Sequence, residues 1–384
     1  MRLSTYTVLL LMLTGFLSCV KPYDFDPDNF ERTLVVEGQL SNETGPHVIT
    51  ITYTYPLDTV LNEYVRGANV WVEDENGDQT IFSQSEDGIY QSPPGFAGKV
   101  GSTYQLHITM ENGEEYQSKP ELLQAAPPIA TIYGRYTEQP NEAGEQNVGG
   151  IQFFIDSEET DHQYFRYEWE EGYKIATPYP ARYRVNEDST LEYMDTSLGI
   201  CYQERFSNEL FYSTTNTSTA NQIIEFPIRF ISEEQQQLRT RYALLVKQFA
   251  ISESAYLFYK QLNENNQSGG SLFDQQSGMV IGNITSIDNP NQNILGYFEA
   301  AGVAEKRSYF KPGDFEEFDF PRYPYNCPYS EIIETTSDSA GYFVEQGANV
   351  FLYDPFLDQV SIHTRSCTDC SFYATLTPPT YWEE

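Results

Sequence analysis

The chain has 384 residues, of which 22 are basic and 56 acidic, so its formal net charge is -34 at pH 7. Because such a surface repels phosphate backbones, the composition excludes nucleic-acid binding as the main role. The length exceeds that of a typical single domain, and 30 Tyr and 24 Phe indicate an aromatic-rich globular protein.

The first residues have the pattern of a bacterial lipoprotein signal. Arg2 supplies a positive charge, residues 8–13 form an apolar run too short to span a bilayer, and the small Ser18 precedes Cys19. We therefore expect residues 1–18 to be a signal peptide and Cys19 to be lipidated and N-acylated. A plain secretory signal and a buried apolar start are the alternatives. No later apolar stretch approaches the roughly twenty residues of a spanning helix, so a lipid anchor is expected.

Residues 19–32 are predicted to form an acidic tether between the lipid and the first folded unit. Alternating Asp24, Asp26 and Asp28 could suggest calcium, but the glycine turn and distant bidentate carboxylate of a calcium loop are missing. A solvated tether is therefore favoured, and the lipid on Cys19 is the only expected bound group. In some Bacteroidota lipoproteins, a similar acidic stretch near a lysine such as Lys21 directs the protein to the cell surface.

Residues 33–125 read as an antiparallel β-sandwich similar to prealbumin-type or immunoglobulin-like modules. Short alternating apolar runs are separated by turn residues. Asn76-Gly77 and Asn112-Gly113 supply the positive φ values that tight hairpins need. The predicted strands cover residues 34–36, 47–53, 68–72, 80–82 and 104–108.

The rest of the chain is predicted to contain a linker and a larger β-rich domain. Residues 126–150 are rich in Gly, Asn, Glu and Pro and are predicted to be a linker or exposed loop. Residues 151–384 carry many strand-forming aromatic residues and one amphipathic helix, which Ser252 caps and Gly269-Gly270 ends. Its apolar stripe is read as core rather than as a ligand platform, and consists of Ala255, Phe258, Tyr259 and Leu262.

Four cysteines remain after the lipidation site, namely Cys201, Cys327, Cys367 and Cys370. In an exported protein an even number favours two disulfides, with three possible pairings; a local Cys367–Cys370 bridge would leave Cys201 joined to Cys327. A four-cysteine zinc site and a redox Cys-x-x-Cys are the alternatives. Zinc is disfavoured because only one short spacing is present, and redox chemistry because no βαβ unit precedes the motif.

Several motifs closely resemble those of the Bacteroidota lipoproteins called domain of unknown function 4249. They are found at residues 34–38, 241–248, 256–259, 269–274, 282–284, 295–298 and 305–307, with Cys367-x-x-Cys370 following. The resemblance implies an outer-membrane lipoprotein, often encoded beside a TonB-dependent receptor. It implies no catalytic residues that could be assigned to positions of this chain.

The glycine motifs of this set have an ordinary structural explanation. Glycines in Gly282-Asn283-Ile284 and in residues 295–298 allow an unusual φ or a close approach of two chain segments. Lys306 and Arg307 could hold a carboxylate ligand, but a structural salt bridge is the favoured interpretation.

The residues offer little support for catalysis. The four histidines are scattered, at His47, His107, His162 and His363. None lies in a zinc-hydrolase or nucleophile-elbow motif, and phosphate-binding and dinucleotide-binding glycine motifs are missing. No catalytic residue, metal site or cofactor is therefore assigned, and no ligand-binding residue can be named.

The leading hypothesis is a non-catalytic, lipid-anchored subunit of the outer membrane that captures substrate for a TonB-dependent receptor. Tethering would raise its effective concentration beside the receptor. The alternatives are an independent surface protein that binds a glycan, peptide or small ligand through aromatic platforms, and a hydrolase with an acidic pair in a cleft.

Overall fold

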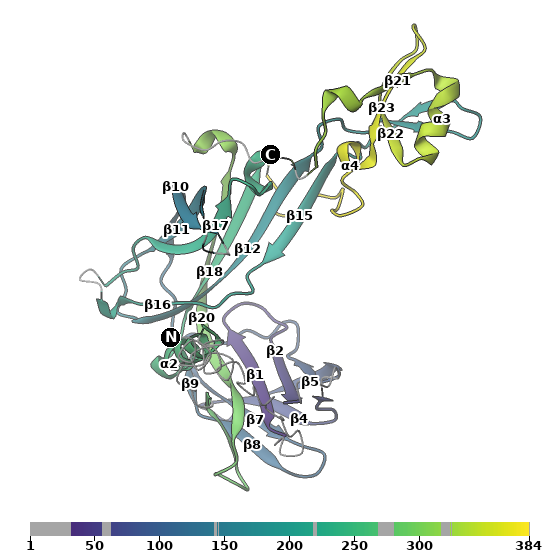
Figure 1. The fold of residues 1–384 in the computed structure, drawn as a ribbon. Helices are drawn as coiled ribbons and strands as arrows, with labels where there is room; N and C mark the ends of the chain where they lie inside the picture. Colours follow the sequence, from purple (N-terminus) through teal and green to yellow (C-terminus); the bar gives the residue numbers. More distant parts are fainter. Residues whose placement is uncertain are drawn as a thin grey trace, which may run out of the picture.

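The computed structural model describes residues 32–55, 63–141, 144, 146–217, 221–267, 280–315, 323 and 325–383. Strands dominate, which confirms the mainly β prediction. The molecule is elongated, with a β-sandwich at one end, a middle layer of long strands and a distal module at the other end (Figure 1). We use the name distal module for residues 177–199 together with 325–370.

The sandwich confirms the pattern read from the first part of the chain. Gly77 and Gly113 have φ values of 85° and 89°, as the two predicted hairpins require. Side chains such as Leu106 and Ile108 alternate into a core that is almost fully buried. Its strands are β1 (Leu34–Ser41), β2 (Val48–Tyr53), β3 (Glu63–Tyr64), β4 (Asn69–Asp74), β5 (Gln79–Glu86), β6 (Ile89–Gln91), β7 (Thr103–Thr109), β8 (Glu115–Ser118) and β9 (Glu121–Leu122).

Two segments from much later in the chain complete the sandwich, which the predicted boundary after residue 125 did not include. Strand β19 (Ile284–Ser286) pairs with β8, and the start of β20 (Ile294–Phe310) runs parallel to β1. Ile284, Ile294 and Phe298 belong to the sandwich core. Burial of these apolar side chains, rather than proximity in sequence, therefore sets the extent of this unit.

The segment predicted to be a linker, residues 126–150, is mostly strand. It contains β10 (Ile129–Pro140) and the start of β11 (Asn147–Ser157), which form an antiparallel hairpin. Gly149 and Gly150 lie within β11, where a side chain would overlap the rings of Tyr136 and Phe230. The glycines thus permit close packing of aromatic rings and do not mark a flexible connection.

The middle layer consists of a long antiparallel sheet that packs against a three-stranded sheet. The core between them includes Phe153, Tyr167 and Tyr242. The three-stranded sheet has the order β10-β11-β17, with β17 at Phe226–Ser232. The long sheet contains β12 (Tyr164–Ala176), β15 (Ile200–Phe206), β16 (Phe211–Thr214), β18 (Tyr242–Ala250) and the end of β20; short helices lie at η2 (Thr215–Thr217), η3 (Gln237–Arg239) and η4 (Pro312–Asp314).

The predicted helix is α2 (Glu253–Gln267). The Ser252 hydroxyl accepts a hydrogen bond from the Ala255 N–H at 3.2 Å, which is the expected N-cap contact. Ala255 is buried against Tyr297 of β20, as the core prediction requires. The other residues of the predicted stripe, Phe258, Tyr259 and Leu262, are partly buried and also line a cavity, so the stripe is only partly core. Gly269-Gly270, the predicted end of the helix, lies outside the described residues.

The distal module is a small five-stranded antiparallel sheet that combines two distant segments. Its core is formed by Ala340, Val350, Val360 and Ile362. The strands are β13 (Tyr183–Val185), β14 (Leu191–Tyr193), β21 (Ile333–Thr335), β22 (Ala348–Asp354) and β23 (Gln359–Thr364), and the helices are η5 (Tyr329–Glu331), α3 (Ser337–Glu345) and α4 (Arg365–Thr368).

Candidate functional site

Two disulfides brace the distal module and confirm the favoured reading of the cysteines. Cys201 of β15 is bonded to Cys370, and Cys327 is bonded to Cys367 of α4. The Cys-x-x-Cys pair is therefore divided between two bridges, and the local bridge considered from the sequence is not formed. With all four sulfurs in disulfides, a four-cysteine zinc site has no thiolate ligands.

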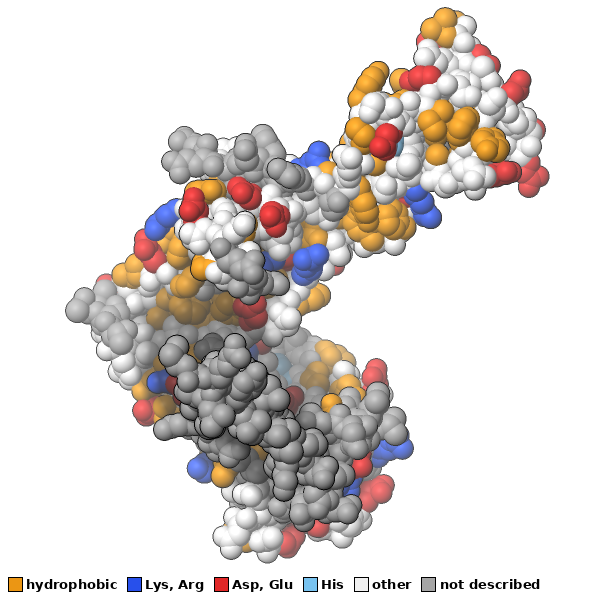
Figure 2. Space-filling view, viewed as in Figure 1, with side chains coloured by type: hydrophobic (Ala, Val, Ile, Leu, Met, Phe, Trp, Pro, Cys, Tyr) orange, Lys and Arg blue, Asp and Glu red, His pale blue; other side chains and the backbone are white. Residues whose placement is uncertain are grey.

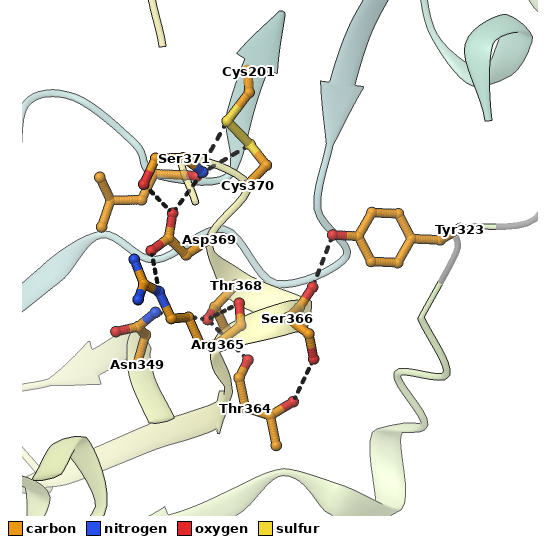
Figure 3. Close-up of polar contacts among 11 residues, drawn as sticks. Cys201, Tyr323, Asn349, Thr364, Arg365, Ser366, Thr368, Asp369, Cys370 and Ser371 are labelled. Atoms are coloured by element: carbon orange, nitrogen blue, oxygen red, sulfur yellow. Dashed lines mark hydrogen bonds and ion pairs between the residues drawn. A yellow bond between two sulfur atoms is a disulfide. The ribbon is translucent and has the colours of Figure 1, made fainter. Parts of the chain in front are cut away.

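A polar network surrounds the Cys201–Cys370 bridge, where the module joins the long sheet (Figure 3). The buried Asp369 carboxylate accepts hydrogen bonds from Arg365 Nε at 2.9 Å and from the backbone N–H of Ser371 at 2.8 Å. Tyr323 donates to the carbonyl of Ser366 at 2.9 Å. The ion pair holds Asp369, and the disulfide holds Cys370. Because these two residues are consecutive, the contacts together fix the direction of the chain where it leaves the module after α4.

The module exposes a set of large apolar side chains. Figure 2 shows hydrophobic side chains on the face of the module that is in view. Phe356 and Leu357, in the β22–β23 turn, are 96% and 71% exposed. Their N–H groups both donate to Asp354 Oδ1, so the turn that presents them is ordered by hydrogen bonds. Other exposed apolar residues of the module are Tyr193, Tyr325, Tyr329, Ile333, Tyr342 and Leu352.

A cavity of about 540 Å³ lies where the sandwich, α2 and the long sheet meet. We call it the junction cavity. Its wall combines charged groups with aromatic rings from α2 and β20. Residues that line it include Glu37, His47, Arg166, Lys247, Tyr259 and Tyr297.

The cationic groups of the junction cavity are already paired. Arg166 forms a bidentate contact with Glu299, with Nη2–Oε1 at 2.9 Å and Nε–Oε2 at 3.3 Å, and it also contacts Glu168. Burial disfavours its charge, but the attraction of Glu299 outweighs this and raises the Arg166 pKa. Lys247 Nζ lies 2.9 Å from Glu43 Oε1. These ion pairs join the different elements that form the cavity wall, and they therefore hold the cavity in one shape.

Tyr259 and Tyr297 stay neutral beside these acids. Burial, followed by the charge of Glu299, raises the Tyr259 pKa well above its usual value. Tyr297 donates a 2.6 Å hydrogen bond to Glu121, a buried carboxylate. Burial also raises the Glu121 pKa, against hydrogen bonds from Tyr297 and Asn283.

The glycine motifs have structural roles, as expected. Gly296 has a φ of 92°, and a side chain there would overlap the backbone of Val36. Gly282 lies against the carbonyl of Gly296 with no room for a side chain. Asn283 holds both backbone groups of Phe298, accepting from its N–H at 2.9 Å and donating to its carbonyl at 2.8 Å. The two motifs therefore join β19 to β20.

Lys306 and Arg307 are also used within the fold. Lys306 Nζ donates to the carbonyl of Ala130. Arg307 lies 4.0 Å from Glu170, which agrees with the favoured salt bridge, and its guanidinium is 3.5 Å from the centre of the Tyr381 ring. The basic pair thus fastens β20 to its neighbours.

The histidines lie on separate elements and form no common site. His47 lines the junction cavity, and burial lowers its pKa. His107 stacks on Trp71 in the sandwich, at 5.1 Å between ring centres. His162 and His363 lie in the middle layer and the distal module. Among the residues that the structure describes, no group of three metal-ligating side chains is found.

Cys19 and the tether residues Asp24, Asp26 and Asp28 lie outside the described residues. Their predicted roles therefore remain expectations. Sequence reasoning named no ligand-binding residue, and it missed the junction cavity because the cavity is built from elements more than 200 residues apart. The one available signal was that residues 34–38, 241–248 and 295–298 all belong to the family motifs and all contribute to its wall.

The described residues form a three-part β protein with a cavity at the junction of the sandwich, α2 and the long sheet. Residues 20–307, more than half of the chain, match the family described as Domain of unknown function (DUF4249). The protein belongs to this family. No curated protein matches the chain. Within the described part of the chain, no helix has the length and apolar character needed to cross a membrane.

Proposed function

We propose that the protein is a non-catalytic lipoprotein of the outer membrane that docks on a TonB-dependent receptor and captures substrate for it. The lipoprotein-like start and the family resemblance support the location and the partner class. The observation that carries the docking role is the exposed apolar surface of the distal module, above all Phe356 and Leu357.

Single exposed apolar side chains are common, but many large ones gathered on one module are typical of an interaction surface. An aromatic side chain contributes 150–250 Å² or so when buried, and such residues dominate the energy of protein interfaces. Asp354 holds the turn in one conformation, which lowers the entropic cost of binding. The two disulfides make the module a rigid support for this surface.

The position of the module suits a bridging role. The sandwich, which follows the predicted tether, and the distal module lie at opposite ends of the molecule (Figure 1). Anchoring through Cys19 would confine the sandwich near the membrane and leave the module free to reach a neighbour. Confinement raises the effective concentration of the docking surface without requiring a large interface.

The test is purification of the tagged full-length protein from native outer membranes in mild detergent. We expect a TonB-dependent receptor to be recovered with the wild type and to be reduced about tenfold or more with F356S/L357S. Ile81→Ser is the matched control, because Ile81 is 67% exposed but lies on β5 of the sandwich. Recovery of the receptor that is equal for all three proteins would contradict docking through the module.

The anchor is tested separately by Cys19→Ala. We expect this variant to be released from membranes but to bind the receptor in detergent solution. Continued membrane association of the processed variant would contradict the lipid anchor without bearing on the docking surface.

A further inference from the structure

A second and larger cavity lies between the three-stranded sheet and the long sheet. Its volume is about 970 Å³, and it is partly open to solvent. We call it the middle groove. Its walls come from the ends of β10 and β11, from β17, and from β12 and β16 on the opposite side. It shares none of its lining residues with the junction cavity or with the exposed surface of the distal module.

Three aromatic side chains line the middle groove, namely Trp169, Phe211 and Phe230. Trp169 is 7% exposed, and its indole N–H has no hydrogen-bond partner among the residues that the structure describes. A buried donor without a partner is costly, and an oxygen atom of a ligand would relieve that cost. One face of the Trp169 ring is covered by the Arg229 guanidinium, 4.7 Å from the ring centre. Phe211 and Phe230 therefore offer the ring faces beside this donor, a combination that suits a ligand with apolar faces and hydroxyl groups.

The groove also presents amide side chains in fixed positions. Gln152 Nε2 donates to the carbonyls of Phe153 at 2.9 Å and Arg229 at 3.2 Å, while its oxygen accepts from Gln139 Nε2 at 2.7 Å. Gln235, on another wall, is held by the N–H of Ser232. The Gln152 amide is thus used within the fold and positions Gln139. Gln139 and Gln235 are the amides that can meet hydroxyl groups, which both donate and accept hydrogen bonds as amides do.

The charges of the groove disfavour an anionic ligand. Its one arginine, Arg229, is occupied by the buried Glu171, with Nε–Oε2 at 2.8 Å and Nη2–Oε1 at 3.1 Å. Its third donor, Nη1, binds the carbonyl of Phe230. Glu209 and Glu234 also line the groove, in a chain with a net charge of -34. No cation in the described lining is thus available to a carboxylate, sulfate or phosphate.

We propose that the middle groove binds a neutral oligosaccharide, with sugar rings against Phe211 and Phe230 and hydroxyl groups on the Gln139 and Gln235 amides and on the Trp169 indole N–H. Sugars combine apolar ring faces with hydroxyl edges, so they fit this combination of side chains. Binding at the groove does not depend on the docking proposed above, because the two use different residues. A soluble glycan is therefore expected to bind without any receptor.

The test uses the purified full-length protein in detergent on an array of neutral hexasaccharides that differ in linkage and sugar, together with acidic glycans and unstructured peptides. Tryptophan fluorescence titration with the best hexasaccharide then gives its affinity. We expect one or more neutral glycans to bind, and W169F and Q139A each to weaken binding about fivefold or more. Thermal unfolding of each variant shows whether the fold is retained.

Trp71→Phe is the matched control, because the Trp71 indole N–H is also buried without a partner in the described residues but lies on β4 of the sandwich. It should change the affinity less than twofold. Absence of neutral glycan binding, preference for peptides or acidic glycans, or unchanged affinity in both W169F and Q139A would overturn the proposal. Since no receptor is present, these outcomes leave the docking proposal to its own test.

Discussion

Replacement of Arg166 by Met is expected to destabilise the protein more than any exposed ion-pair substitution. The Arg166 side chain is 8% exposed and that of Glu299 is 1% exposed, and two hydrogen bonds at 2.9 and 3.3 Å join them. The guanidinium also lies 4.3 Å from the centre of the Phe249 ring. Methionine can fill much of the space, but it leaves the Glu299 carboxylate buried without its cation.

The magnitude follows from this imbalance. Removal of one partner from a buried ion pair costs about 3–5 kcal/mol, since the remaining charge is desolvated without compensation. A typical domain is stable by about 5–15 kcal/mol, so a loss of this size is a large fraction of the total. The double variant R166M/E299M removes both charges, and we expect it to recover more than half of the loss because apolar pairs often replace buried ion pairs at little cost.

Urea unfolding followed by circular dichroism and by tryptophan fluorescence measures these differences. Arg66→Met is the control, because Arg66 pairs with Asp87 at an exposed position, and it should leave the unfolding midpoint unchanged. A loss below about 1 kcal/mol for R166M, or a double variant less stable than R166M, would show that the Arg166–Glu299 pair does not hold the junction together.

Three further predictions concern other parts of the fold. Burial raises the pKa of Glu121, so the protonated carboxyl contributes most to the free energy of unfolding below about pH 4.5, and this contribution is lost as the pH rises through the raised pKa. In urea unfolding, E121Q should therefore gain stability relative to wild type between about pH 5 and pH 8. C327A/C367A opens a loop with a separation of 40 residues and should cost about 4 kcal/mol, measured by urea unfolding with limited proteolysis of the distal module. G296A, at a φ of 92° and against Val36, should cost about 3 kcal/mol or more, and an unchanged melting temperature would contradict this strain.

Local signals in the sequence predicted local structure well. The two Asn-Gly pairs predicted their hairpins, and Ser252 predicted the start of α2, because turns and caps depend on a few adjacent residues. Gly149-Gly150 contributed to the wrong prediction of a linker. In the sequence, a glycine pair looks the same in a linker and in a strand that packs against aromatic rings. The neighbouring residues that would decide between these, such as Phe230, lie too far away in sequence.

Long-range pairing could not be read from the sequence for a related reason. Val36 lies opposite Gly296 in the parallel β1–β20 pair, although 260 residues separate them. The distal module combines residues 177–199 with 325–370: the second segment supplies the buried core, and Tyr183, Val185 and Leu191 of the first pack against it. The disulfide pairing depends on how these two segments assemble, so the sequence alone could not decide among the three possible pairings.

The continuity of β20 explains how one chain could keep the two proposed binding surfaces independent. The strand begins in the sandwich core at Ile294 and ends in the core of the middle layer at Phe310, so movement of one layer against the other would break a single strand. The distal module joins the middle layer at the Cys201 end of β15, which lies opposite Ile175 of β12, six residues along that strand from Trp169. A partner that binds the tip at Phe356 would therefore leave the middle groove open, and a ligand could be held there while the protein stays docked.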